Sequence, residues 1–400
     1  MSKTSGLQIT APGNELDRVL TIASAYSGKS SLRSDAVTFT ADDDGVWLSA
    51  TDLERWVRVR MNCEWKGTGK VSVPGKSFLA MCKAIGSTLT TLTVSAEHVS
   101  LKAAASKFKC PTIPEDGVPD PPDAPEFKAL TMESSVFQDI ALRVATAATS
   151  DDTRPILQCI HFSLDGSFLA EATDTHRIVR AAVPVLESAS DPLDVLVYSS
   201  VVKSAAGYFA GYPDMDIEMF ISGNLVVFQN PSLQIGSRRV DGQYPKTERV
   251  ISAAVNGQKW GISVPRVELL RVLLQALPVL RGGCFAVRFD VEFPNDFDNA
   301  GDNDNEPATL RVRARSDEAS TFECEINVEM TGDDPVPFAL NPKYLIDMIS
   351  SPAWGTDILL QLDQSLSPVV LTGSGTGSCG GLGVLMPMDF SRLKGYEDGT

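Results

Sequence analysis

The 400-residue sequence contains no run of about 18 apolar residues, the length that a helix needs to cross a membrane. Its first residues, Met1 to Gly6, lack the basic segment and the apolar core of a secretory signal peptide. These two absences argue against a helical membrane protein and predict a cytoplasmic location without membrane partners.

Cysteine is sparse and poorly placed for cross-linking or metal binding. The cysteines are odd in number and widely scattered, and no two of them form a Cys-x-x-Cys pair. Neither a disulfide framework nor a zinc site is therefore indicated. We expect no metal or other cofactor, and reduced, mostly buried thiols at Cys63, Cys82, Cys110, Cys159, Cys284, Cys324 and Cys379.

Histidine is equally scarce, with only His98, His161 and His176 in the chain. His176 lies two residues after Asp174, which invites a catalytic interpretation. No Gly-x-Ser-x-Gly motif or other partnered nucleophile accompanies it, so a hydrolase would lack its attacking group. A peptide-binding or structural histidine is the simpler interpretation, and we expect neither catalytic residues nor enzymatic activity.

Two stretches imitate ligand-binding loops but lack required parts. Residues 373–381 are rich in glycine, yet a phosphate-binding loop needs a following helix and a Lys-Ser/Thr pair, and here a strand is expected. Residues 298–304 have the composition of a calcium loop, but the glycine is misplaced and no glutamate stands at the required distance. The first stretch predicts a hairpin and the second a solvated loop, with weak divalent binding left open.

The composition predicts a folded protein whose overall charge opposes nucleic acid. Hydrophobic residues make up 43% of the chain and charged residues 22%, which is typical of globular domains. The net charge is −16, whereas non-specific DNA affinity comes mainly from Lys and Arg that neutralise phosphates. The distribution of charge decides this question, because the field at the contacting surface is what DNA would meet.

Internal repeats determine that distribution. An Arg-Val pair recurs in helical apolar patterns at Arg18, Arg143 and Arg271, which are 125 and 128 residues apart. A strand followed by a helix start recurs around Lys76, Lys203 and Lys343, and Ala50-Thr51-Asp52 is echoed by Ala172-Thr173-Asp174. Repeats of this length are whole domains rather than solenoid units.

The sequence therefore predicts an α+β protein of three tandem domains, each with two helices packed on antiparallel sheet. Residues 111–125 contain six prolines and predict an extended connector, and a second join is expected near residues 252–257. The predicted domains are residues 1–126, 127–252 and 253–390, with an acidic insertion at 295–307 and a tail at 391–400.

Each of six predicted helices, at residues 14–28, 73–86, 133–149, 198–211, 264–280 and 342–350, carries at least one cation. Their acidic residues are Glu15, Asp17, Glu133, Asp139, Glu268 and Asp347, and their basic residues are Arg18, Lys76, Lys83, Arg143, Lys203, Arg266, Arg271 and Lys343. The helices thus sum to +2 and the remainder to −18. They are either ordinary solvated faces or, together with Lys29, a weakly basic surface that faces DNA and permits sliding.

Five ordered motifs resemble one known family. They are Val71–Ile85, Ser106–Lys109 followed by Thr112-Ile113-Pro114, Ala172–Arg177, Val240–Pro245, and Asn341 and Tyr344 with the ending Val384–Met388. Ala172–Arg177 is similar to the family's Ala-Thr-Asp-Gly-His-Arg. From about residue 14 to residue 390 the chain resembles the beta subunit of the bacterial replicative DNA polymerase, the sliding clamp.

The resemblance implies a processivity factor. Two chains would close head to tail into a homodimeric ring around duplex DNA, held by topology rather than by sequence, with the helices lining the hole. The ring contact would place Val279 and Leu280 against Lys107 and Phe108 of the neighbouring chain. A clamp-type adaptor that binds peptides without encircling DNA is the alternative.

The resemblance also implies a pocket between the second and third domains that binds short peptides of the replicative polymerase, the clamp loader and other clamp-binding proteins. Its residues would be Leu157, Thr173, Thr175, His176, Arg177, Ile178, Pro245, Arg249, Val250, Asn341, Tyr344, Leu366, Val384, Met386, Pro387 and Met388. Such side chains suit apolar peptide anchors with a polar rim.

Two departures from the family leave the preferred partner peptide open. Thr175 replaces a glycine, which matters if that position needs a positive φ. Asp389-Phe390 replaces a basic-apolar ending, and ten further residues follow.

Overall fold

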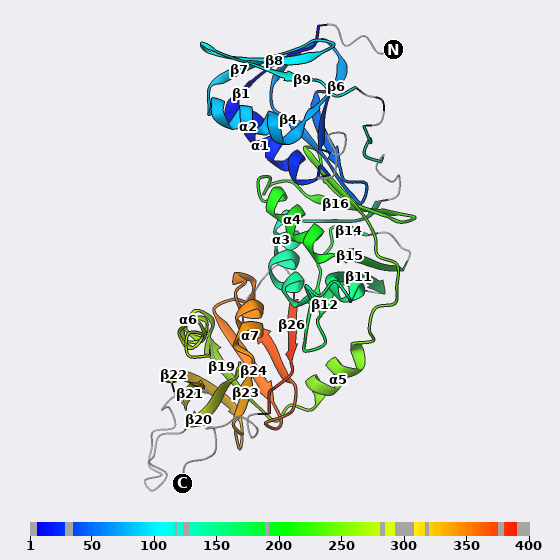
Figure 1. The fold of residues 1–400 in the computed structure, drawn as a ribbon. Coiled ribbons are helices and arrows are strands. Elements are labelled where there is room, and N and C mark those ends of the chain that lie inside the picture. Colours follow the sequence, from blue (N-terminus) through cyan, green and yellow to red (C-terminus); the bar gives the residue numbers. More distant parts are fainter. Residues whose placement is uncertain are drawn as a thin grey trace. The chain divides into compact units, whose positions relative to one another are not determined.

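The computed structural model describes residues 6–28, 35–114, 116, 118–122, 128–165, 167–188, 192–280, 285–292, 308–316, 320–374 and 380–389. The chain divides into two compact units (Figure 1). The N-terminal unit comprises residues 1–134, 185–189 and 204–239, and the C-terminal unit comprises residues 135–184, 190–203 and 240–400. Lys29, Cys284, Cys379, Phe390, the insertion 295–307 and the tail 391–400 lie outside the described residues.

The N-terminal unit contains two antiparallel sheets. The smaller is built from β1 (Gln8–Pro12), β5 (Glu64–Lys66), β7 (Leu89–Val94), β8 (His98–Ala103) and β9 (Ser106–Pro111), in the order β5-β1-β7-β8-β9. The larger is built from β2 (Ala36–Ala41), β3 (Val46–Thr51), β4 (Arg55–Met61), β6 (Gly69–Pro74), β10 (Lys128–Met132), β14 (Glu187–Ser188), β16 (Ile217–Ser222), β17 (Leu225–Asn230) and β18 (Leu233–Arg238). Its order is β14-β10-β16-β17-β18-β4-β3-β2-β6, so the β4–β18 ladder joins strands of the first and second repeats.

Two helices of the N-terminal unit, α1 (Gly13–Ala25) and α2 (Gly75–Ile85), pack against each other. Helix α1 buries Leu16, Val19, Leu20 and Ala23, whose spacing forms one helical stripe. Its first residue must be small, because a Cβ on Gly13 would lie 2.0 Å from the carbonyl oxygen of Gly86.

The C-terminal unit is organised around one long antiparallel sheet. Its strands are β11 (Cys159–Asp165), β12 (Ser167–Thr173), β13 (Arg177–Ala182), β15 (Leu193–Tyr198), β19 (Trp260–Pro265), β20 (Val287–Glu292), β21 (Ala308–Arg315), β22 (Thr321–Gly332), β23 (Phe338–Leu340), β24 (Asp357–Leu362), β25 (Val369–Gly373) and β26 (Gly380–Leu385). The order is β15-β11-β12-β13-β26-β25-β24-β19-β22-β21-β20-β23. The β13–β26 ladder joins strands of the second and third repeats.

The remaining helical elements are α3 (Ser134–Arg143), η1 (Val144–Ala147), η2 (Pro155–Gln158), α4 (Ser199–Phe209), α5 (Glu248–Asn256), α6 (Arg266–Ala276), α7 (Pro342–Ile349) and η3 (Pro352–Trp354). All six predicted helices are present, but each is shorter than expected. Helix α5 was missed, because the segment expected to form the second join is largely helical. Among the described residues no helix is long and apolar enough to cross a membrane.

The architecture confirms the α+β prediction with mainly antiparallel sheet. Of the five described cysteines, Cys82, Cys110 and Cys159 are buried and Cys63 and Cys324 are half-buried, and all five are free thiols. Burial raises the pKa of Cys82 and Cys159 to about 12, so these thiols stay protonated near neutral pH. The expectation of mostly buried thiols is confirmed for these residues.

Arg143 corrects one prediction. Its side chain is only 1% exposed, forms an ion pair with Asp139, and lies 5.0 Å from the ring centroid of Trp354. A guanidinium held in the interior cannot contact phosphates. The assignment of Arg143 to a DNA-facing surface is therefore wrong, and this arginine belongs to the core of the C-terminal unit.

We predict that Arg143→Ala lowers the free energy of unfolding by about 3 kcal/mol, because it leaves the buried Asp139 carboxylate without its guanidinium. Arg271→Ala, at the repeat-equivalent but exposed position, is the matched control and should change this energy by less than about 0.5 kcal/mol. Thermal unfolding followed by scanning calorimetry compares the two. Equal effects of the two substitutions would contradict the structural role of Arg143.

Candidate functional site

A tight turn connects β12 to β13 at the centre of the predicted pocket. The Thr173 hydroxyl donates to the Arg177 carbonyl (2.7 Å) and accepts from the Thr175 amide (3.2 Å). The Asp174 carboxylate accepts from the amides of His176 and Arg177 at 3.0 and 3.1 Å. These bonds satisfy the turn internally and present the His176 side chain outward, where it is exposed.

Arg177 fastens this turn to helix α7. Its guanidinium donates to Asp174 (3.0 Å), to Asp347 (3.1 Å) and to the Tyr344 carbonyl (3.3 Å). It also lies 4.6 Å from the centroid of the Tyr344 ring. The arginine is buried, and its Nε and Nη1 already donate to partners within the unit. It therefore holds the turn and the tyrosine in place, which is a structural role and not ligand binding.

An aromatic pair and an exposed methionine form the rim beside this turn. The His176 ring stacks on Tyr344 with centroids 5.9 Å apart, and the His176 carbonyl accepts from the Met386 amide (2.9 Å). Met386 is 41% exposed. The end of β26 and the β12–β13 turn therefore present an imidazole and a flexible thioether side by side.

The apolar part of the site lies on the adjoining ladder. Ile178 pairs with Val384, and both belong to one buried cluster with Ile251 and Ala254 of α5 and with Val370. Helix α5 contributes two residues to this cluster, Ile251 and Ala254. Its first turn leaves Val250 43% exposed, so an apolar surface continues outward from the cluster.

Lys203, in the first turns of α4, is exposed and lies near the charged pair of Arg177 and Asp347. Burial of its stem and the positive charge of Arg177 lower the pKa of Lys203, while Asp347 acts in the opposite direction. The lysine thus belongs to the electrostatic network of Arg177 as well as to the set of helical cations.

The other predicted pocket residues are distributed around this centre. Asn341 caps α7, where its side chain accepts from the Lys343 amide (3.0 Å), and it therefore has a structural role. Leu157 is nearly buried in η2, and the Met388 amide donates to the Ala339 carbonyl (2.8 Å). Pro245, Arg249 and Leu366 are exposed, and Pro387 is half-buried.

The N-terminal unit contains a second copy of the turn. Thr51, Asp52 and Arg55 repeat the hydrogen bonds of Thr173, Asp174 and Arg177, and the Arg238 amide donates to Glu54 as Met386 donates to His176. The third residue has a positive φ in both copies, 78° at Leu53 and 80° at Thr175. This position therefore does require the left-handed region, in which a threonine is strained.

The second copy lacks an open apolar surface. Trp56 and Gly236 occupy the positions that Ile178 and Val384 occupy in the C-terminal unit. The Trp56 ring covers the strand so closely that a Cβ on Gly236 would lie 2.0 Å from it, and Trp56 is only 1% exposed. Where the C-terminal unit has the Ile178–Val384 pair, the N-terminal unit has an indole.

The helical cations separate into two groups. Lys76, Lys83, Lys203, Arg271 and Lys343 are exposed and remain candidates for DNA contact. Two arginines bond mainly within their own unit.

Arg18 donates two hydrogen bonds to Glu15 at 2.7 Å, and Arg266 donates to the carbonyls of Gly355 (2.8 Å) and Ile349 (3.1 Å) near the end of α7. A repeated position in the sequence does not reveal this division, because burial differs between the copies.

The predicted ring contact needs one correction and one addition. Leu280 is only 1% exposed and belongs to the interior, whereas Val279 is half-buried and Lys107 is exposed. Phe108 is half-buried on β9, which is an end strand of its sheet. The sequence did not indicate β22, whose residues 321–328 pair with β21 while residues 329–332 pair with β19.

Comparisons of the sequence identify relatives. Residues 31–122 match the family described as DNA polymerase III beta subunit, N-terminal domain, and residues 131–246 match its central domain. The beta sliding clamp of Streptomyces coelicolor is 25% identical over 341 residues, which is 83% of this chain and 84% of that protein. The beta sliding clamp of Staphylococcus epidermidis is 22% identical over 331 residues, which is 79% and 81% of the two chains.

Solved structures share the fold along nearly the whole chain. The beta subunit of a DNA polymerase of Streptococcus pyogenes superposes with a TM-score of 0.83 at 16% identity, covering 95% of this chain and 99% of that one. The DNA polymerase III beta subunit of Thermotoga maritima gives 0.79 at 22% identity, covering 96% and 99%.

We predict that Thr175→Gly raises the free energy of unfolding by about 1 kcal/mol, because glycine adopts φ 80° without strain. The turn's hydrogen bonds to Thr175 use its backbone amide and are retained. Thr153→Gly, in an exposed turn where φ is not positive, is the control and should lower the stability. Chemical denaturation measures both, and a loss of stability in Thr175→Gly would show that the threonine side chain is needed.

Proposed function

The chain belongs to the family of DNA polymerase III beta subunits, the bacterial sliding clamps, and we propose that two copies close into a ring around duplex DNA and tether a replicative polymerase. One observation carries the proposal: the fold of these clamps extends over 95% or more of this chain. The ladders β4–β18 and β13–β26 support it, since each of them joins strands of two neighbouring repeats in one shared sheet.

Such a protein acts by topology rather than by chemistry. A closed ring stays on DNA even when each contact is weak, so no reaction is needed to keep the polymerase in place. The raised pKa values of the buried thiols and the engagement of Arg177 in structural bonds agree with this role. The role would place the protein in the cytoplasm with the chromosome.

Two strand edges of opposite charge favour ring closure. Among the strands that the structure describes, β9 pairs with β8 alone, and it exposes Lys107 and Lys109. Within the described residues, the first half of β22 pairs only with β21 and exposes Glu323 and Glu325. We propose that β9 of one copy joins β22 of the other, since free edges recruit strands and opposite charges select the partner.

The inner surface of the ring would contact DNA through the five exposed cations of the helices. Lysine predominates among them, and lysine contacts phosphates as a mobile point charge. Contacts of this kind exchange readily and carry no sequence information, which permits sliding.

The groove beside the Thr173–Arg177 turn would bind partner peptides of the polymerase, the clamp loader and other clamp-binding proteins. Val250 and Met386, beside the buried Ile178–Val384 pair, supply exposed apolar surface for one or two anchors, and the exposed His176 and Arg249 accompany them. Methionine and a first helical turn can adapt to several sequences. A second peptide groove is not expected at the equivalent turn, because Trp56 fills it.

The alternative of a peptide-binding adaptor shares this groove but needs no ring. The free edges of β9 and β22 and their opposite charges favour the clamp, since an adaptor would gain nothing from leaving two long edges unpaired.

We predict that Lys107→Glu with Lys109→Glu abolishes self-association, because both edges are then acidic. The matched control is Lys102→Glu on the interior strand β8, which should remain dimeric. Native mass spectrometry distinguishes a species of 43.0 kDa from one of twice that mass.

A complementary variant completes this test. Glu323→Lys with Glu325→Lys should also be monomeric alone, but an equimolar mixture of the two variants should form a heterodimer in which both contacts are complementary. Failure of the mixture to associate, with both variants folded, would contradict the β9–β22 contact.

A further inference from the structure

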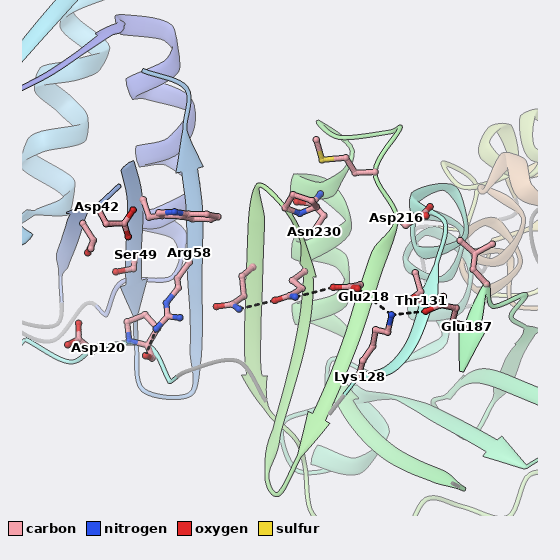
Figure 2. Close-up of a pocket in the computed structure, with 18 of the residues that line it drawn as sticks. Asp42, Ser49, Arg58, Asp120, Lys128, Thr131, Glu187, Asp216, Glu218 and Asn230 are labelled. Atoms are coloured by element: carbon pink, nitrogen blue, oxygen red, sulfur yellow. Dashed lines mark hydrogen bonds and ion pairs between the residues drawn. The ribbon is translucent and has the colours of Figure 1, made fainter. Parts of the chain in front are cut away.

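The N-terminal unit contains a large polar cavity of about 1330 Å³. Figure 2 shows Asp42, Ser49 and Arg58 on one side of it and Thr131, Glu218 and Asn230 on the other. The volume exceeds the 300 to 1,000 Å³, roughly, of pockets that hold small molecules. The cavity is therefore large enough for several residues of a polypeptide.

One continuous row of polar side chains crosses the sheet in this cavity. Strand pairing places Ser49, Arg58, Gln234, Gln229, Glu218, Thr131 and Glu187 directly opposite one another on successive strands from β3 to β14. All seven line the cavity. Six intervals of about 4.8 Å give this row a length of roughly 29 Å, close to that of an extended octapeptide.

The corresponding face of the C-terminal unit is covered by its own chain. Arg180 and Glu171 stand where Arg58 and Ser49 stand, and Glu248 of α5 bonds to Arg180 at 2.6 Å. Leu382, the next position in the row, packs on the cluster that includes Ile251 of α5. An internally paired arginine and glutamate and a leucine, all beneath a helix, therefore occupy the place of the polar row.

Among the described residues of the connecting segment, Asp120 and Pro121 contact the edge of the row in the N-terminal unit. The Pro121 carbonyl accepts from Arg58 (3.0 Å), and Asp120 pairs with Lys70 (2.5 Å). The glutamines further along bond to each other and to Glu218, both at 3.1 Å. This part of the sheet has polar groups and a cavity above them where the other unit has a helix.

Three buried polar atoms in this cavity have no hydrogen-bond partner among the described residues: Asn230 Nδ2, Thr131 Oγ1 and Gln234 Oε1. Asn230 is 7% exposed and Thr131 is 8% exposed. A buried polar group without a partner is costly, so these atoms favour a ligand that supplies both an acceptor, for Asn230, and a donor, for Gln234.

The charge of the lining selects the class of ligand. Five carboxylates, from Asp42, Asp120, Glu187, Asp216 and Glu218, face three cations, from Arg58, Lys70 and Lys128. Lys70 pairs with Asp120 and Lys128 pairs with Glu187 (2.7 Å), whereas Glu218 lies 3.5 Å from Lys128, and Asp42 and Asp216 have no ion pair among the described residues. This excess of negative charge disfavours nucleic acid and favours a cation. A polyamine is cationic but has no acceptor for Asn230, whereas a peptide backbone has both donors and acceptors.

From this geometry we infer that the cavity binds an extended peptide segment of a partner protein that carries lysine or arginine. Its backbone lies along the row and bonds to the unpartnered amides and hydroxyl, and its cationic side chains reach Glu218 and Asp216. This site is separate from the groove beside Arg177 and does not depend on ring closure.

The probe is an acetylated, amidated octapeptide of alternating lysine and serine, titrated calorimetrically into the full-length protein at low salt. The expected result is saturable binding that is weakened about fivefold by Glu218→Gln with Asp216→Asn. Gln234→Lys, which places a cation on the floor, should weaken it as well.

The controls separate this site from general attraction to an acidic protein. Glu97→Gln with Asp333→Asn removes two exposed carboxylates outside the cavity and should leave the affinity unchanged. The same octapeptide with glutamate in place of lysine should not bind.

Three results would overturn the inference: no binding of the lysine peptide, equal weakening by the control pair, or spermine binding as tightly as the peptide. The melting temperature of each variant establishes that it is folded. None of these outcomes bears on the ring, because the test needs only the N-terminal unit of an intact chain.

Discussion

The structure depends on backbone hydrogen bonds between strands of different repeats. In the C-terminal unit, six residue pairs join β13 to β26, from Arg177 with Leu385 to Ala182 with Gly380. In the N-terminal unit, β4 and β18 are joined in the same way. These ladders join neighbouring repeats within one sheet of each unit, and the proposed peptide site lies where the first ladder ends, between the Thr173–Arg177 turn and Met386.

The two ladders are equivalent, but what covers them differs. Helix α5 covers the first and buries Ile178 and Val384, while Val250 and Met386 stay exposed near its edge. The second carries Trp56 over Gly236 and, beyond it, a row of polar residues under a cavity. A proline-rich connector cannot form a covering helix, because proline removes an amide donor and clashes with the preceding turn. The proline content of the connector therefore explains why it does not cover the polar row with a helix, as α5 covers the corresponding face of the C-terminal unit.

The sequence predicted the repeats and the helices correctly, because each depends on local pattern, and it left open whether position 175 needs a positive φ, which the structure shows it does. It misplaced Arg143 and Leu280, since a repeated position says nothing about which neighbours enclose it. It missed α5, which begins within a polar connector, and the free half of β22. The polar row could not be predicted at all, because its seven residues come from seven strands whose register only the folded sheet defines.

The central claim is that two copies close into a ring, and negative-stain electron microscopy of the purified protein tests it most directly. The account predicts closed rings with two-fold symmetry, six domain-sized densities and an open centre. Fields that contain only single chains at every concentration would contradict the clamp and favour the adaptor.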